Sequence, residues 1–200
     1  MLMACGVLRA CGRGTEWVRA DGKTPQTLEA VHGSGPGDVW AVGELGTTVH
    51  WDGKTWSLSA FPGGANAPVR VWASGPGEVW TTQDLLGSKL MHWTGEGWSA
   101  VPVEAGSYPD CVDLWGTGPG ELWALCDLTS TRRVVHRSAE GWRVLPAEIP
   151  DDILQGDGWT ALWASSGGKV WTVGEPGVVF HFDGSIWHEE EGRTWPRGWT

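Results

Sequence analysis

The stretch GSGPGDVWAVGELGTTVHWDGKTWSL, residues 33–58, occurs four times along the chain with changes. Its first part, SGPGDVW at 34–40, returns as SGPGEVW at 74–80, TGPGELW at 117–123 and SSGGKVW at 165–171. Its second part, HWDGKTW at 50–56, returns as HWTGEGW at 92–98, HRSAEGW at 136–142 and HFDGSIW at 181–187. The chain is therefore a tandem repeat of a unit of about forty residues, and this period indicates a repeat fold.

Each unit divides into short runs that favour β-strands. In the second unit they are rich in Val and Trp, are bounded by turn residues and span 69–73, 78–82, 89–93 and 97–101. Pro36, Pro76 and Pro119 set φ at the first corner of a turn. The Gly after each is predicted to take the positive φ of a type II turn. A short oxygen-bearing side chain begins the later turn of each unit and can bond that turn's backbone.

Most of the 17 Trp recur at fixed offsets in the units. A four-stranded sheet of this size cannot bury both faces alone, so neighbouring units must stack and Trp must fill the gaps. The Trp predicted to be structural are Trp40, Trp80, Trp123, Trp171, Trp56, Trp98, Trp142 and Trp187. The alternative is a set of exposed platforms for sugars. Trp159 and Trp195 fall outside the register and are the better candidates for exposure.

Four-stranded units of this length in tandem predict an all-β fold, a β-propeller with four blades. The predicted blades cover about 28–60, 68–103, 110–146 and 159–190. Residues 1–27 are predicted to hold one orphan outer strand at Trp17, and residues 191–200 an irregular tail. We expect the chain to be part of a larger propeller or to complete a ring by self-association. A closed ring of four blades is the alternative.

The repeat resembles the Trp-rich propeller repeats of bacterial surface and secreted proteins, with GSGPGDVWAVG followed by HWDGKTW. It is also similar to the Asp-box (BNR-like) and Ycf48-like propeller repeats. The chain departs from the Asp box because the intervals from Asp52 to Trp56 and from Asp183 to Trp187 are one residue shorter, and Thr94 and Ser138 replace the Asp. The resemblance implies a propeller fold over residues 28–190 and does not name a ligand.

Charge and the N-terminus bear on partners and location. The net charge is −10 and no basic cluster exceeds Arg132–Arg133, which argues against nucleic acid and against an anionic membrane surface. No apolar stretch is long enough to span a membrane. Residues 2–5, LMAC, resemble the end of a bacterial lipoprotein signal but lack its charged start and apolar run. Two explanations are open. The first is a clipped export signal, which implies a periplasmic, cell-surface or secreted protein with a lipid anchor. The second is a chance match.

Loop lengths point to one face of the predicted disc. The interval from Trp to His in the second and third strands is 10, 12, 13 and 10 residues, whereas the other turns inside the units keep their length. Variable loops on a rigid scaffold carry function. The predicted ligand-binding residues are Glu44, Gln83, Asp84, Tyr108, Asp127, Arg132, Arg133, Asp152, Asp157, Trp159 and Glu175, with Asn66, Asp110 and Asp151 as further candidates.

One His recurs in every unit, as His50, His92, His136 and His181. Zn²⁺ ligands lie about 2.0–2.3 Å from the ion, whereas equivalent positions in stacked sheets are about 10 Å apart. We therefore predict no metal site, and a buried His that is hydrogen-bonded within each blade. Cys111 and Cys126 flank one turn and therefore sit on neighbouring strands of one predicted hairpin. They are either a disulfide or two small buried apolar residues.

Enzymatic chemistry has little support in the sequence. There is no GxSxG, HExxH, P-loop or Cys–His nucleophile pattern. Paired carboxylates of a glycosidase are not evident, and Tyr108 is the only Tyr that a sialidase-like site could use. The prediction is a non-enzymatic binding or scaffold module without cofactors, for a protein or carbohydrate ligand. A lectin is the first alternative and a sialidase-like glycoside hydrolase the second.

Overall fold

The computed structural model describes residues 19–62, 68–83, 89–103, 107–128, 131–146, 159–175 and 177–190. Within them the chain forms four four-stranded antiparallel sheets and one short 3₁₀ turn, Glu44–Gly46. The strands of the first two sheets are β1 (Leu28–Gly35), β2 (Asp38–Gly43), β3 (Thr47–Trp51), β4 (Trp56–Ser59), β5 (Pro68–Gly75), β6 (Glu78–Gln83), β7 (Leu90–Trp93) and β8 (Trp98–Val101). Those of the last two are β9 (Asp110–Gly118), β10 (Glu121–Leu128), β11 (Thr131–Ser138), β12 (Gly141–Val144), β13 (Trp159–Ala164), β14 (Val170–Gly174), β15 (Val178–Phe182) and β16 (Trp187–Glu189).

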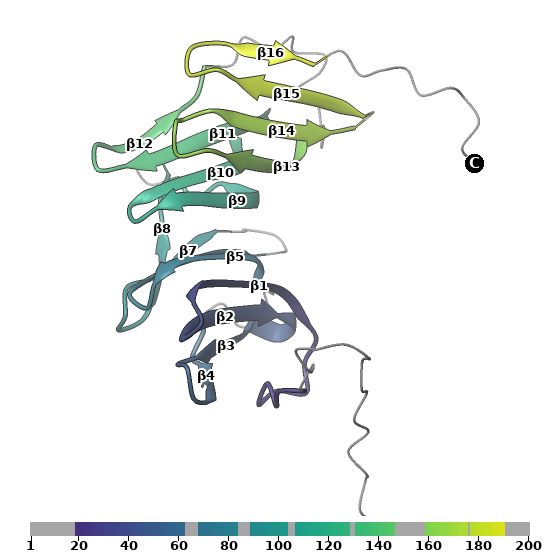
Figure 1. Cartoon of the computed structure of the whole chain (residues 1–200). Coiled ribbons are helices and arrows are strands. Elements are labelled where there is room, and N and C mark those ends of the chain that lie inside the picture. The colour runs from purple at the N-terminus through teal and green to yellow at the C-terminus, as the bar shows by residue number, and fades with distance from the viewer. Residues whose placement is uncertain are drawn as a thin grey trace, which may run out of the picture.

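Each sheet is one blade of a β-propeller, which confirms the predicted fold class. The strands of a blade follow one another in space as they do in the sequence, so every blade is an up-and-down meander. The first strands of successive blades pack side by side, β1 with β5, β5 with β9 and β9 with β13. Figure 1 shows the four sheets following one another through the molecule, with blade 1 (β1–β4) at one end and blade 4 (β13–β16) at the other. Blades 2 and 3, β5–β8 and β9–β12, lie between them.

Every gap between successive blades holds its own apolar cluster. The cluster between blades 1 and 2 joins Trp40 and Val42 to Val79 and Trp98. Corresponding clusters lie between blades 2 and 3 and between blades 3 and 4. Because the sheets pack face to face, both faces of an inner blade are buried. This agrees with the prediction that Trp side chains fill the gaps between stacked units.

The turns follow the predicted chemistry in part. Asp52 Oδ1 accepts hydrogen bonds from the backbone N–H groups of Lys54 and Thr55, at 2.8 and 2.7 Å, which confirms the role of the short polar side chain that begins this turn. The Gly–Pro–Gly turns differ from the prediction. Gly120 takes a positive φ of 76°, but Gly37 and Gly77 do not. The strand pair next to each of the three turns contains a register shift.

Cys111 and Cys126 form a disulfide across the facing strands β9 and β10. The sequence left this bond open because only one unit carries the pair. Both residues are buried in the gap between blades 2 and 3. The predicted orphan strand at Trp17 and the tail at 191–200 lie outside the described residues, and the predicted blade boundaries stay a prediction.

Candidate functional site

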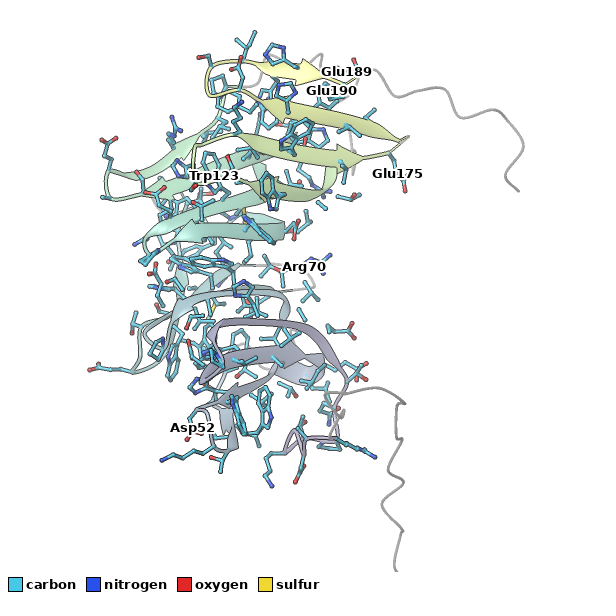
Figure 2. All side chains as sticks on the ribbon, in the orientation of Figure 1. Asp52, Arg70, Trp123, Glu175, Glu189 and Glu190 are labelled. Carbon is cyan, nitrogen blue, oxygen red and sulfur yellow. A yellow bond between two sulfur atoms is a disulfide. The ribbon has the colours of Figure 1, made fainter. Side chains whose placement is uncertain are left out.

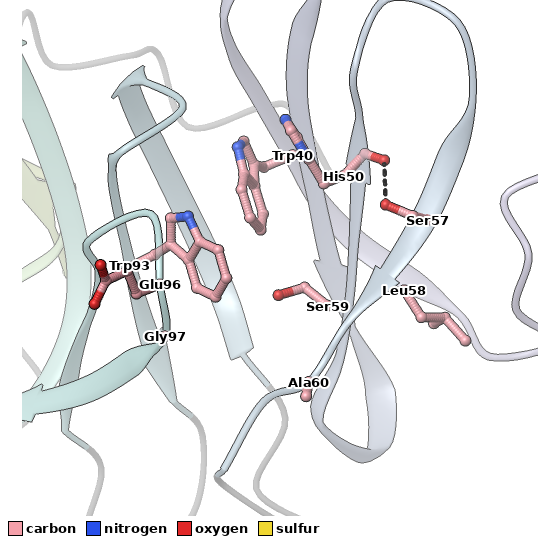
Figure 3. A pocket seen from close by; sticks show the side chains of 9 residues that line it. All are labelled: Trp40, His50, Ser57, Leu58, Ser59, Ala60, Trp93, Glu96 and Gly97. Carbon is pink, nitrogen blue, oxygen red and sulfur yellow. Dashed lines mark hydrogen bonds between the residues drawn. The ribbon is translucent and has the colours of Figure 1, made fainter.

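A groove of about 410 Å³ opens between blades 1 and 2 (Figure 3). It lies between β4 of blade 1 and the turn that joins β7 to β8 in blade 2. Its lining residues are Trp40, His50, Ser57, Leu58, Ser59, Ala60, Trp93, Glu96 and Gly97. None of them belongs to the predicted ligand-binding set.

The floor of the groove is an aromatic stack that a buried carboxylate holds in place. Trp40 is fully buried and stacks on His50, with ring centroids 4.3 Å apart and an interplanar angle of 19°. Asp38 Oδ1 accepts a hydrogen bond from Trp40 Nε1 at 3.1 Å and lies 2.7 Å from His50 Nε2. Trp93 tilts against Trp40 with centroids 5.4 Å apart. The floor is therefore preformed, because each ring is fixed by a neighbour or by a carboxylate.

Polar groups lie along the walls of the groove. Ser59 Oγ accepts a hydrogen bond from Trp98 Nε1 at 3.2 Å, and Ser57 is exposed. On the opposite wall, Trp93 is half-buried and donates its Nε1–H to the carbonyl of Pro76 at 3.0 Å, which fixes the ring. Glu96 is exposed and carries the one carboxylate of the lining. Two hydroxyls, one carboxylate and indole surface suit a ligand with both apolar and cationic groups.

The position of Trp93 carries different side chains in the other two gaps between described blades. At the position of Trp93, blade 3 carries Arg137, whose guanidinium lies 5.2 Å from the Trp80 ring centroid and donates to the carbonyl of Gly120. Blade 4 carries Phe182 there, and Phe182 is fully buried in the cluster with Trp123. This position on the third strand of the blade therefore varies, while the Trp–His stack beside it repeats.

The described members of the predicted ligand-binding set mostly lie at the ends of strands on the edge opposite the short turns. Figure 2 labels Glu175 on this edge and Asp52, in a short turn, on the other. Glu44, Tyr108 and Glu175 are exposed there, and Lys89 Nζ lies 5.1 Å from the Tyr108 ring centroid. Arg133 is half-buried and its Nη1 has no hydrogen-bond partner. Asp110 is exposed. Their role in binding stays a prediction, and Asp84, Asp152, Asp157, Asn66, Asp151 and Trp195 lie outside the described residues.

Four members of the predicted set are buried or paired inside the fold. Arg132 is buried, and its guanidinium donates to both carboxylate oxygens of Asp127 at 2.8 and 3.2 Å. The same guanidinium donates to the carbonyl of Trp159 at 2.6 Å, which ties blade 3 to the start of blade 4. Gln83 is also buried. Trp159 was expected to be exposed, and this is wrong: its side chain is 3% exposed, in the cluster between blades 3 and 4.

The repeated Trp are mainly core residues, with one exception. Trp40, Trp80, Trp123 and Trp98 are buried, and Trp56, Trp142 and Trp187 are half-buried. Trp171 is 37% exposed, although it occupies the same position as Trp40, Trp80 and Trp123. The expectation that it is a core residue fails because no described strand packs on that face of blade 4.

The recurring His stack on the recurring Trp in every blade, with centroids 4.3, 4.0, 3.7 and 4.8 Å apart from blade 1 to blade 4. The predicted hydrogen bond within the blade is present at His50 with Asp38 and at His136 with Glu121, both at 2.7 Å. It is absent at His92, because Glu78 instead binds Ser74 and the N–H of Gly120 in blade 3. His181 lies 2.6 Å from Glu190. Burial lowers the pKa of His92 and of His136.

A buried carboxylate that the sequence did not single out links three blades near the inner strands. Asp113 accepts a hydrogen bond from the N–H of Leu162 at 2.7 Å and one from Arg70 Nε at 3.1 Å. Its burial raises its pKa. The signal for such a residue would be the break in the repeat, because Arg70 and Ala161 hold the equivalent positions in blades 2 and 4.

In the residues that the structure describes, no group of three or more His, Cys, Asp or Glu side chains could hold a metal ion. No helix in that part of the chain could span a membrane.

Solved structures with this fold are similar to the chain at low sequence identity. Ycf48 bound to a D1 peptide matches 83% of this chain and 53% of its own, with 19% identity and a TM-score of 0.59. Virginiamycin B lyase from Staphylococcus aureus matches 83% of this chain and 56% of its own, with 14% identity and a TM-score of 0.61. PorZ of Porphyromonas gingivalis, a bacterial surface component of a secretion system, matches 78% and 25%, with 11% identity and a TM-score of 0.56.

The chain thus spans about half the length of the first two structures. These likenesses show a β-propeller, and they include both a peptide-bound protein and a lyase. No family model matches the sequence, and no curated protein matches it significantly.

Proposed function

We propose that this chain is a non-enzymatic β-propeller module that binds an extended peptide segment in the groove between blades 1 and 2. The observation that carries the proposal is the preformed groove beside Trp93, with its stacked Trp40 and His50 and its exposed carboxylate, Glu96. A rigid floor of Trp40 and His50 limits the ordering that a ligand must impose on the protein. The peptide bound to Ycf48 supports this class of ligand.

The chemistry of the groove favours a peptide with a basic residue beside an apolar one. Glu96 is exposed at the mouth and offers a carboxylate to a Lys or Arg side chain. The indole of Trp93 offers a surface for an apolar side chain or for a guanidinium plane. The net charge of −10 increases the rate at which a basic segment meets the protein. We infer an exported bacterial protein, which the surface location of PorZ supports.

The test is a screen of the folded chain against an array of short peptides and an array of glycans, in parallel. A peptide that binds is then titrated against Trp93→Arg, which places the blade 3 residue in the groove, and against Glu96→Gln. We expect Trp93→Arg to weaken binding by about tenfold or more, since central aromatic contacts carry most binding energy. Glu96→Gln should weaken it by about two- to fivefold and reduce its salt dependence.

Glu140→Gln is the matched control, because Glu140 occupies the same turn position in blade 3, where Arg137 lies over the Trp80 ring. It should leave peptide binding unchanged. A peptide that binds Trp93→Arg and Glu96→Gln as tightly as the native chain would contradict the proposed site. Glycan binding without any peptide binding would replace the proposal with the lectin alternative, and turnover of a bound ligand would contradict a non-enzymatic module.

A further inference from the structure

The outer face of blade 4 is apolar and uncovered among the described residues. Trp163 and Trp171 lie directly opposite each other on β13 and β14, and they are 46% and 37% exposed. Val173, two residues further along β14, is 43% exposed. His181 stacks on Trp171 on the same face. We call Trp163, Trp171, Val173 and His181 the open face of blade 4. Neighbouring large apolar side chains with this exposure mark an interaction surface.

The same positions are covered in the other blades. Trp40, Trp80 and Trp123 correspond to Trp171, and all are 1% exposed because the next sheet packs on them. Val42, Thr82 and Leu125 correspond to Val173 and are fully buried. The open face of blade 4 is therefore the half of a blade-to-blade contact whose other half is not among the described strands.

Blade 1 carries the complementary half on its own outer face. The residues of blade 2 that cover Trp40 include Val71, Val79 and Trp98. Blade 1 has Val31, Val39 and Trp56 at these positions. Val31 is 66% exposed, whereas Val71 is 9% exposed, and Val39 and Trp56 are half-buried. We call Val31, Val39 and Trp56 the open face of blade 1. Val49, also on this side of blade 1, is already buried.

We propose that the open face of blade 4 packs against the open face of blade 1 in a second copy of this chain. The contact repeats the interface that already joins blades 1 and 2 inside one chain, so its shape and apolar character are set by the repeat. Two copies placed head to tail make two such contacts and one ring of about eight blades, within the known range for propellers. That this chain matches about half of larger propeller chains fits this count.

The first measurement is the mass of the full chain in solution, by light scattering and by sedimentation at several concentrations. A closed pair has twice the chain mass of 21.6 kDa and does not grow further at higher concentration. A monomer at all concentrations overturns the proposal. An open series of larger species also overturns it, because a head-to-tail contact that fails to close builds filaments.

Charge variants then test which faces meet. Trp171→Lys alone and Val31→Glu alone should each give a monomer, because an unpaired charge would be buried in both contacts. An equimolar mixture of the two should recover the pair, since one contact is unaltered and the other places Lys opposite Glu. Native mass spectrometry distinguishes the mixed pair from each variant alone. Two single variants that stay paired, or a mixture that stays monomeric, overturn head-to-tail packing.

Leu45→Glu is the matched control, because Leu45 is equally exposed but lies in the β2–β3 connection, away from both open faces. It should leave the mass of the pair unchanged. Circular dichroism of each variant shows whether the blades stay folded, so that loss of pairing is separated from loss of structure. A control that dissociates the pair would overturn the assignment to the two open faces.

Discussion

Trp123 and Trp171 occupy the same position in the repeat, and their surroundings differ completely. Both follow a short turn on the second strand of a blade, and both stack on a His of the third strand. Trp123 is 1% exposed because blade 4 covers it, whereas Trp171 is 37% exposed. The difference teaches that the repeated motif specifies the strand and the stacked Trp–His pair, whereas burial of the Trp depends on a neighbouring sheet.

Truncation of the two indoles should show this difference most strongly. Trp123→Ala should lower the free energy of unfolding by about 3–5 kcal/mol, since it removes a fully buried Trp and leaves a cavity. Trp171→Ala should cost less than about 1 kcal/mol at a concentration where the chain is monomeric, because surface changes have small effects. Urea unfolding of both variants measures this. Equal losses would contradict the contrast between a covered and an open blade.

The disulfide in blade 3 offers the next largest effect. Cys111 and Cys126 are 15 residues apart, and the facing positions in blade 2 are Pro68 and Gln83, without a bond. The double variant Cys111→Ala/Cys126→Ala should lower stability by about 3 kcal/mol on a chain-entropy estimate for a loop of this length. Urea unfolding with and without reductant checks it. A reductant that leaves the stability of the native chain unchanged would show that the bond does not form in solution.

A smaller effect on stability is expected where Gly116 of blade 3 lies close to Trp72 of blade 2. A Cβ added at Gly116 would lie 2.0 Å from Cε2 of Trp72, which is buried and cannot move freely. Gly116→Ala should therefore cost about 1–3 kcal/mol by overpacking. Gly118→Ala, two residues along β9, has nothing within 4 Å of its Cβ and is the control. Similar losses for the two variants would mean that Trp72 moves aside at little cost.

The smallest predicted effect is a dependence of the stability on pH, to which His92 contributes. Burial holds the pKa of His92 below its ordinary value of 6.5. The unfolded chain therefore takes up more protons near and below pH 6.5 than the folded chain does, so stability falls as pH drops through this value. Urea unfolding at pH 7.5 and 5.5 should show this fall, and His92→Gln should reduce it. A variant with the full pH dependence of the native chain would exclude His92 as a source.

Sequence reasoning predicted the blades better than the site. The offsets between Trp and His predicted the strand pairing, because residues that face each other on adjacent strands recur in every unit. Trp123, for example, faces His136. Trp159 was misplaced because it lies at the start of β13, outside the recurring motif, although the sheet buries it. The groove was missed because its lining joins Ser59 of one blade to Trp93 of the next, and no local pattern relates the two.

The sequence by itself determined the all-β architecture, the four blades and the recurrence of one Trp and one His at fixed places in each. Alternation along a strand and the chemistry of turns are local properties, and four copies of the same pattern reinforce one another. The tertiary structure alone decided which Trp are covered, which carboxylate reaches which His and where a gap stays open. Those outcomes depend on the side chain that the neighbouring sheet presents, as Trp93, Arg137 and Phe182 show at one repeated position.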